Sequence, residues 1–217
     1  MNFATDRDLL MLEPNLFVDV PFLSQQRLRV TDGVLSGTTL TSVTADFSAA
    51  RVEAGSVVLI GRTGEMAVAH EVIGCPDAHT LTVSLPRSAV GDPAIASRSG
   101  TGLEVTVRTF TPQAALVHNV LLQMLELDPV SAVPGQGEDA IVSLSVMSRL
   151  EVLGTLEQIY TAAAGLLGDS SNLMRKAKFY QERFASGVRK ATVLLDLDGD
   201  GYADVRRRLD VVNLVRV

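Results

Sequence analysis

The stretch LEVTVRTFTPQAALVHNVLLQML, residues 103–125, contains the change of hydrophobic period on which the predicted fold depends. Its first part alternates apolar and polar residues, which places Leu103, Val105 and Val107 on one face of a strand. From Thr111 the apolar residues follow helical spacing, and a threonine cap followed by proline favours a helix start. The chain is therefore predicted to pass here from a β-rich region to a helical region.

Residues 26–110, on the amino-terminal side of this junction, are predicted to form an antiparallel β-module. Apolar and β-branched residues at a period of two indicate about six short strands, among them the segments 38–43, 57–60 and 81–85. Turn signals separate these strands, as at Asp32 with Gly33. This spacing is typical of a small antiparallel barrel or sandwich.

Residues 111–190 are predicted to form three helices, and a short opening helix that ends near Leu12 completes a small bundle. The first of the three has two adjacent apolar stripes, Leu116, Val120, Met124 and Leu127 on one and Val117, Leu121 and Leu125 on the other. Such a wide apolar face suits a helix that packs on two neighbours. The second, over about residues 143–167, contains Gly154 and Gly165, and each glycine weakens a helix by roughly 1 kcal/mol relative to alanine.

The predicted fold class is α+β. A small α-helical bundle consists of residues 1–25 and 111–190, and an antiparallel β-barrel or sandwich module is inserted into it as residues 26–110. Residues 191–217 follow as a C-terminal β-hairpin and tail.

Composition excludes several classes of function. The formal net charge of −6 argues against a surface that neutralises phosphates, and Cys75, the single cysteine, cannot form an intramolecular disulfide. No basic segment followed by an apolar run opens the chain, and no apolar run approaches the roughly 20 residues that span a bilayer. We expect a soluble protein from a reducing compartment, with no membrane partner.

The densest acidic cluster lies in the stretch ATVLLDLDGDGYADVRRRLDVVNLVRV, residues 191–217. Its aspartates at positions 1, 3, 5 and 9 match a calcium loop, and a glycine occupies position 6; these residues are Asp196, Asp198, Asp200, Asp204 and Gly201. Position 12, which requires a bidentate glutamate, is Arg207. The alternative is a β-hairpin in which residues 193–197 pair with 203–209 across a glycine-containing turn, and the missing twelfth ligand favours this hairpin.

No catalytic, cofactor-binding or metal-ligating residues are predicted, so we expect the chain not to be an enzyme. His70 and Glu71 begin like a zinc-protease motif, but no second histidine follows four residues later. His79 and His118 lack a metal-ligand spacing, and Cys75 has neither a CxxC partner nor an evident base.

Several segments together resemble the head-to-tail connector (adaptor) proteins of the tailed-bacteriophage neck. They are TDRDLL at residues 5–10, the inserted β-module, the helical block over residues 144–164 and the closing LDLDGDGYADVRRRLDVVNLVRV. The resemblance implies a homo-oligomeric ring, commonly a dodecamer, that binds beneath the portal and joins it to a downstream tail or neck protein. It also implies a location in the virion after synthesis in the host cytoplasm, with DNA only as passing cargo.

The apolar end of the chain is the predicted partner-binding segment. It contains Leu209, Val211, Val212, Leu214, Val215 and Val217. An unpaired apolar strand invites strand addition, so we expect this segment to dock on the portal or on a neighbouring subunit while the bundle forms the ring wall. The alternative function is a calcium-dependent binding module that uses the loop 196–204.

Overall fold

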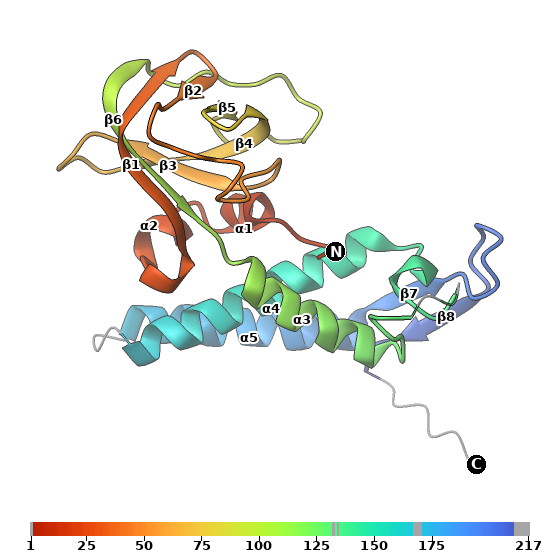
Figure 1. The fold of residues 1–217 in the computed structure, drawn as a ribbon. Coiled ribbons are helices and arrows are strands. Elements are labelled where there is room, and N and C mark those ends of the chain that lie inside the picture. Colours follow the sequence, from red (N-terminus) through yellow and green to blue (C-terminus); the bar gives the residue numbers. More distant parts are fainter. Residues whose placement is uncertain (1, 132, 134, 167–170, 211–217) are drawn as a thin grey trace. The chain divides into compact units, whose positions relative to one another are not determined.

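The computed structural model describes residues 2–131, 133, 135–166 and 171–210 (Figure 1). The chain forms two compact units. The barrel unit is Thr5–Phe110, and the helical unit consists of residues 1–4 and 111–217 in their described parts. The opening segment 5–25 therefore belongs with the barrel unit, although its helical pattern predicts a place in the helical bundle.

The barrel unit confirms the antiparallel β-module and selects the barrel over the sandwich. Its strands are β1 (Gln26–Ser36), β2 (Thr39–Thr41), β3 (Val57–Gly61), β4 (Val68–Asp77), β5 (Thr80–Ser84) and β6 (Gly100–Arg108). They close in the order β1-β2-β5-β4-β3-β6, because β6 pairs with both β3 and β1. Alternate residues point inward as the period-two pattern predicted, so that Val58, Ile60, Leu81 and Val105 fill the barrel.

Three short helices precede the first strand: α1 (Asp6–Leu12), α2 (Leu16–Asp19) and the 3₁₀ turn η1 (Leu23–Gln25). At the start of α1 the Asp8 carboxylate accepts a 2.8 Å hydrogen bond from the Thr5 backbone N–H, which is half of a capping box. Phe17 of α2 is fully buried, with its ring centroid 5.2 Å from that of Phe110 after β6. These contacts attach the opening segment to the barrel.

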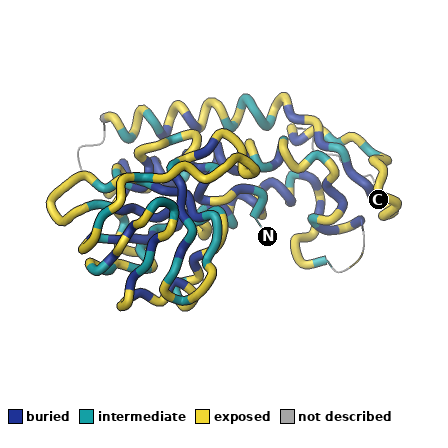
Figure 2. Tube along the Cα trace, turned by 90° about the horizontal axis from the view of Figure 1, so that it is seen from above, coloured by how far each residue is buried: buried dark blue, intermediate teal, exposed yellow. Residues whose placement is uncertain are grey.

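The helical unit contains α3 (Thr111–Met124), the 3₁₀ turn η2 (Glu138–Ala140), α4 (Leu144–Leu166) and α5 (Ser171–Lys190). α4 packs on both of the other long helices, and every residue from 150 to 156 is buried. α3 buries one of its two predicted apolar stripes, and of the other stripe Met124 packs against the same core and Leu127 is buried in it. Val117, Leu121 and Leu125 are buried in the core, but Leu116 and Val120 are 60% and 40% exposed (Figure 2 distinguishes buried from exposed segments).

The chain continues into a two-stranded antiparallel hairpin, which confirms the hairpin prediction. β7 (Thr192–Leu195) pairs with β8 (Val205–Arg208), with Leu195 opposite Val205. On its other edge β7 meets the segment around Ile141, through a β-bridge to Leu195. Val193 and Leu195 enter the core of the helical unit, so the hairpin is anchored by burial of its apolar face.

Candidate functional site

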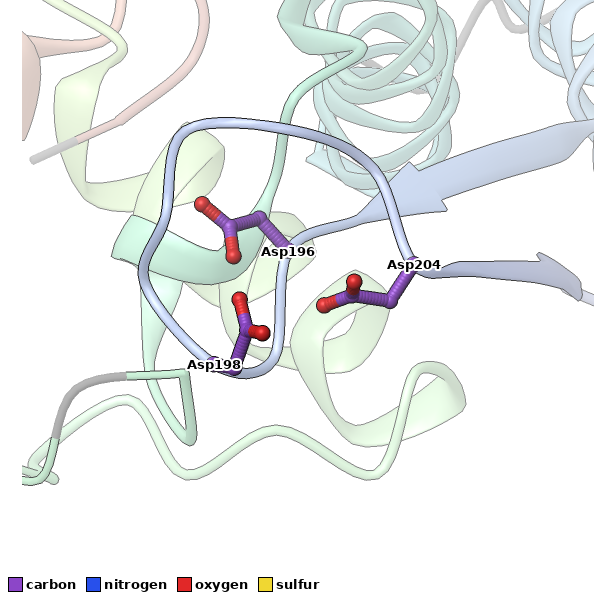
Figure 3. Close-up of side chains that lie close together, drawn as sticks. All are labelled: Asp196, Asp198 and Asp204. Atoms are coloured by element: carbon purple, nitrogen blue, oxygen red, sulfur yellow. The ribbon is translucent and has the colours of Figure 1, made fainter.

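The acidic loop between β7 and β8 is the candidate site (Figure 3). Asp196 directly follows β7, and Asp204 directly precedes β8, so the two strands bring their carboxylates to the same end of the hairpin. Oxygen atoms of Asp196, Asp198 and Asp204 all lie within 4.8 Å of one another, and the three side chains point into the space that the loop encloses. Carboxylate oxygens gathered in this way can attract a hard cation.

The Asp196 side chain organises the turn by accepting hydrogen bonds from backbone N–H groups of the loop. Its Oδ1 accepts the N–H of Gly199 at 2.7 Å, and its Oδ2 accepts the N–H of Gly201 at 2.8 Å. Both glycines have positive φ, 78° and 88°, a conformation that glycine adopts without strain. Burial alone would raise the pKa of Asp196, but these N–H donors outweigh it and the pKa is lowered. The carboxylate therefore stays charged as part of the turn.

Asp198, Asp200 and Asp204 are exposed and are also used by the turn. Asp198 accepts the Asp200 N–H at 3.2 Å, and Asp204 accepts the N–H of Leu197 at 2.9 Å. The Asp200 N–H lowers the pKa of Asp198, but burial and the neighbouring negative charges of Asp200 and Asp204 raise it above its usual value. The carboxylates of Asp198, Asp200 and Asp204 therefore repel one another across the loop.

The arginine at loop position 12 turns away from the aspartates. The Arg207 guanidinium donates to the carbonyl of Leu125 at the end of α3 and lies 3.5 Å from the Glu126 carboxylate. Arg208 pairs with Asp210 at 2.9 Å. Within the described residues, no ion pair joins the three arginines of β8 to the loop carboxylates, so the loop keeps its negative charge.

The structure revises the predicted partner-binding segment at its first residue. Leu209 is only 5% exposed and packs in the core of the helical unit. It lies just after β8, and its side chain enters the same core as Val193 of β7. It is therefore a core residue and not a docking residue. Val211, Val212, Leu214, Val215 and Val217 lie outside the described residues.

The sequence did not indicate a buried carboxylate network in the helical unit. Glu151 of α4 is fully buried and accepts the backbone N–H groups of Phe3 and Ala4, both at 3.1 Å. His118 Nδ1 lies 3.0 Å from Glu151 Oε2, and its ring contacts the Phe3 ring in a tilted arrangement, with 4.3 Å between centroids. Burial raises the pKa of Glu151 despite these donors. The network ties the first residues of the chain to α3 and α4.

A second buried network lies in the barrel unit. Glu71 of β4 is fully buried between the guanidinium groups of Arg7 and Arg87, and Arg87 Nε lies 2.6 Å from Glu71 Oε1. His70, the preceding residue, is buried as well, and burial lowers its pKa. The only sequence signal for either network was a charged residue inside an otherwise apolar run.

A surface cavity of about 310 Å³ lies over β3 and β6 in the barrel unit. Its charged lining residues are Arg62, Glu65, Glu104 and Arg108. The two positive and two negative side chains balance, so the charges of the cavity do not select an anionic or a cationic ligand.

No family model, no curated protein and no solved structure matches this chain. Within the described residues, no helix has both the length and the apolar character needed to cross a lipid bilayer.

Proposed function

We propose that the chain is a structural subunit of the neck of a tailed bacteriophage. Copies assemble into a ring, commonly of twelve, that connects the portal to the next neck or tail protein and continues the channel through which DNA passes. The helices form the ring wall, and the apolar C-terminal segment docks on the portal or on a neighbouring subunit. The sequence resemblance motivates the proposal, and the exposed stripe of α3 supports its central element, self-association.

The stripe consists of Leu116 and Val120, one helical turn apart, with the partly buried Met124 a further turn along α3. The adjacent stripe of α3 already fills the core with Val117 and Leu121. A second apolar stripe on a helix is expected to have a second neighbour. An adjacent copy of the chain supplies that neighbour in a ring.

Electron microscopy and mass photometry of the purified protein test the ring directly. We expect a closed ring with a central channel for the wild type, and monomers for the double variant Leu116→Asp with Val120→Asp, because it places charges in the contact. Val43→Asp is the control, since Val43 is 87% exposed in the barrel unit and lies outside the stripe. A ring that forms equally well with both stripe residues changed contradicts the proposal.

Portal docking is tested by removing residues 211–217 and no more, because Leu209 belongs to the core. We expect the shortened chain to fold with an unchanged melting temperature and to lose binding to its portal in a pull-down. Unchanged portal binding by the shortened chain argues against the C-terminal segment as the docking element.

The approach of Asp196, Asp198 and Asp204 to within 4.8 Å favours a second candidate function, a calcium-dependent binding module. Isothermal titration with calcium separates the two functions. Micromolar binding that Asp198→Ala abolishes and Asp210→Ala preserves supports the module, since Asp210 lies outside the loop. A titration without heat, together with an unchanged melting temperature in calcium, rejects it.

A further inference from the structure

One face of α5 carries a positive charge that contrasts with the acidic character of the chain. The helix contains six basic residues and one acidic residue, in a protein of formal net charge −6. At 3.6 residues per turn, five of the basic residues and the single glutamate fall on the side opposite the buried Ala177 and Tyr180. These exposed residues are Arg175, Lys178, Arg183, Arg189, Lys190 and Glu182. We call them the basic face.

Two of these charges have a local role. Arg189 and Lys190 lie in the last turn of α5, where the helix dipole favours cations. Arg175 and Lys178 lie in the first half of the helix, where the dipole gives them no such support. The helix dipole therefore does not account for these two charges.

The basic face is not neutralised within the described residues. None of its five cations pairs with a carboxylate there. Arg175 donates to the amide oxygen of Asn172 at 2.8 Å, and the Arg183 guanidinium lies 4.6 Å from the ring centroid of the exposed Phe179. Both contacts leave the positive charge available to a partner.

The complementary charge is carried by the acidic loop, at the other end of the same unit. Asp198, Asp200 and Asp204 are exposed in the hairpin that follows the C-terminal end of α5 (Figure 1). From Arg175 to Lys190 the helix rises about 22 Å, at 1.5 Å per residue. The loop of one chain therefore cannot reach the first half of its own α5. A second copy can bring its loop there.

We propose that the acidic loop of one copy binds the first half of the basic face of α5 on the next copy, through Arg175 and Lys178. This inference rests on the proposed ring. Two different surfaces at opposite ends of one unit make a head-to-tail contact, and contacts of this type close into rings when the rotation allows. The contact is electrostatic and solvent-exposed, so added salt weakens it.

Nucleic acid is the competing partner for a basic helix face. The pattern favours protein because Glu182 lies among the cations and the chain as a whole is acidic, whereas a phosphate-binding surface collects cations alone. A loop of matching negative charge is also present in the same chain.

Exchange of charges between copies tests the contact. One variant carries Arg175→Glu with Lys178→Glu, and the other carries Asp198→Lys with Asp200→Lys. Each alone places like charges at every contact, so we expect self-association on the order of a hundredfold weaker in sedimentation velocity at low salt. A one-to-one mixture restores opposite charges at both kinds of contact, and we expect it to recover wild-type association.

Recovery on mixing also shows that both variants are folded. As a control, Arg62→Glu with Arg98→Glu changes the net charge equally on exposed residues of the barrel unit and is expected to leave association unchanged. The milder pair Asp198→Asn with Asp200→Asn keeps the oxygen acceptors of the turn and is expected to weaken association less.

The inference is overturned if the Arg175 and Lys178 variant associates like the wild type, or if the mixture does not recover. It is also overturned if that variant loses binding to a 20-base-pair DNA duplex while its association stays intact, which assigns the face to nucleic acid. Failure of the proposed ring has a different signature. Wild-type association and recovery on mixing then persist, but electron microscopy shows no ring with a channel.

Discussion

Glu71 is a buried counter-charge for two arginines of the barrel unit. It is fully buried and accepts hydrogen bonds from Arg7 Nε, from Arg87 Nε and from the backbone N–H of Arg87. Burial would raise the pKa of Glu71, but the two arginines outweigh it and the pKa is lowered. The carboxylate is thus held in its charged form and compensates two buried cations.

We expect Glu71→Gln to lower the free energy of unfolding by about 3–5 kcal/mol, because it leaves the buried Arg87 guanidinium without its counter-charge and leaves Arg7 with Asp8 alone, 3.7 Å away. A carboxyl group with a lowered folded pKa contributes stability above its unfolded pKa and loses it as the pH falls through the folded value. The wild type should therefore lose stability below about pH 4.5 more steeply than the variant. Urea denaturation across this range measures both effects.

Glu104→Gln is the matched control for this prediction. Glu104 pairs with Arg29, whose side chain is 57% exposed, and exposed pairs contribute about 1 kcal/mol or less. Equal losses for the two variants would show that the buried network has no special role.

The contribution of Asp6 to stability depends on pH in the opposite direction to that of Glu71. Burial raises its pKa to about 6, against the effect of the hydrogen bond that its Oδ1 accepts from the Phe110 N–H at 2.8 Å. Between the unfolded and folded pKa values the folded state binds more protons, so stability falls as the pH rises from about 4 to about 6. Asp6→Asn keeps the acceptor and removes the titration. We expect the wild type to lose about 3 kcal/mol relative to this variant over that range in urea titrations. Parallel curves would contradict the raised pKa.

At the scale of elements, α4 has 23 residues and contains a weak helix former, Gly154, near its centre. The close packing of neighbouring helices explains why a glycine stands there. A Cβ atom at Gly154 would lie 2.7 Å from Val117 Cγ1 on α3 and 3.1 Å from the Phe184 ring on α5. The glycine thus lets three helices approach closely. At Gly165, further along α4, a Cβ would meet nothing within 4 Å.

We expect the two Gly→Ala changes in α4 to have opposite signs. Gly154→Ala should lower the free energy of unfolding by about 1–3 kcal/mol through overpacking, although alanine is the better helix former. Gly165→Ala should raise it by up to about 1 kcal/mol. Thermal and urea denaturation of the two variants measure both changes in the free energy of unfolding. Stabilisation by Gly154→Ala would contradict the close approach of α3 and α5 to α4 at this position.

The elements that the sequence predicted well are those with a strong local pattern. The period-two residues Val105 and Val107 form β6, and the Asp and Gly residues of 196–201 form the turn of the hairpin. α3 begins at Thr111, where the Thr-Pro pattern predicts a helix start, although Thr111 is the first helical residue and not the cap before it. In each case, neighbours along the chain determine the outcome, so one sequence contains the information.

The buried charges could not be predicted in the same way, because their partners are distant along the chain. Glu71 meets Arg7, which is 64 residues away, and Glu151 meets the backbone of Phe3, which is 148 residues away. A single sequence gives no signal for such pairings. The same limit applies to the second stripe of α3, since amphipathic spacing shows that Leu116 is apolar but not whether this chain or another copy covers it.

At the scale of the whole molecule, the division into two units follows from these long-range contacts. The chain passes between the units twice, after Ala4 and after Phe110. The helical pattern of residues 5–25 suggested a place in the helical bundle, but Arg7 bonds to Glu71 and Phe17 packs against Phe110. Side-chain partners, and not the type of secondary structure, assign the opening segment to the barrel.

This assignment predicts that residues 5–110 fold alone and that residues 26–110 do not. The longer fragment has its own closed barrel and the core that includes Phe47 and Val58. Removal of residues 5–25 takes away the fully buried Leu16 and Phe17, at a cost of about 2–5 kcal/mol each, and one of the two arginines that pair with Glu71. Together these losses are comparable to the 5–15 kcal/mol that stabilises a typical domain. We expect dispersed amide signals in nuclear magnetic resonance and one cooperative thermal transition for 5–110, and neither for 26–110. If 26–110 unfolds as cooperatively and at the same temperature as 5–110, the opening segment is not part of the barrel's folding unit.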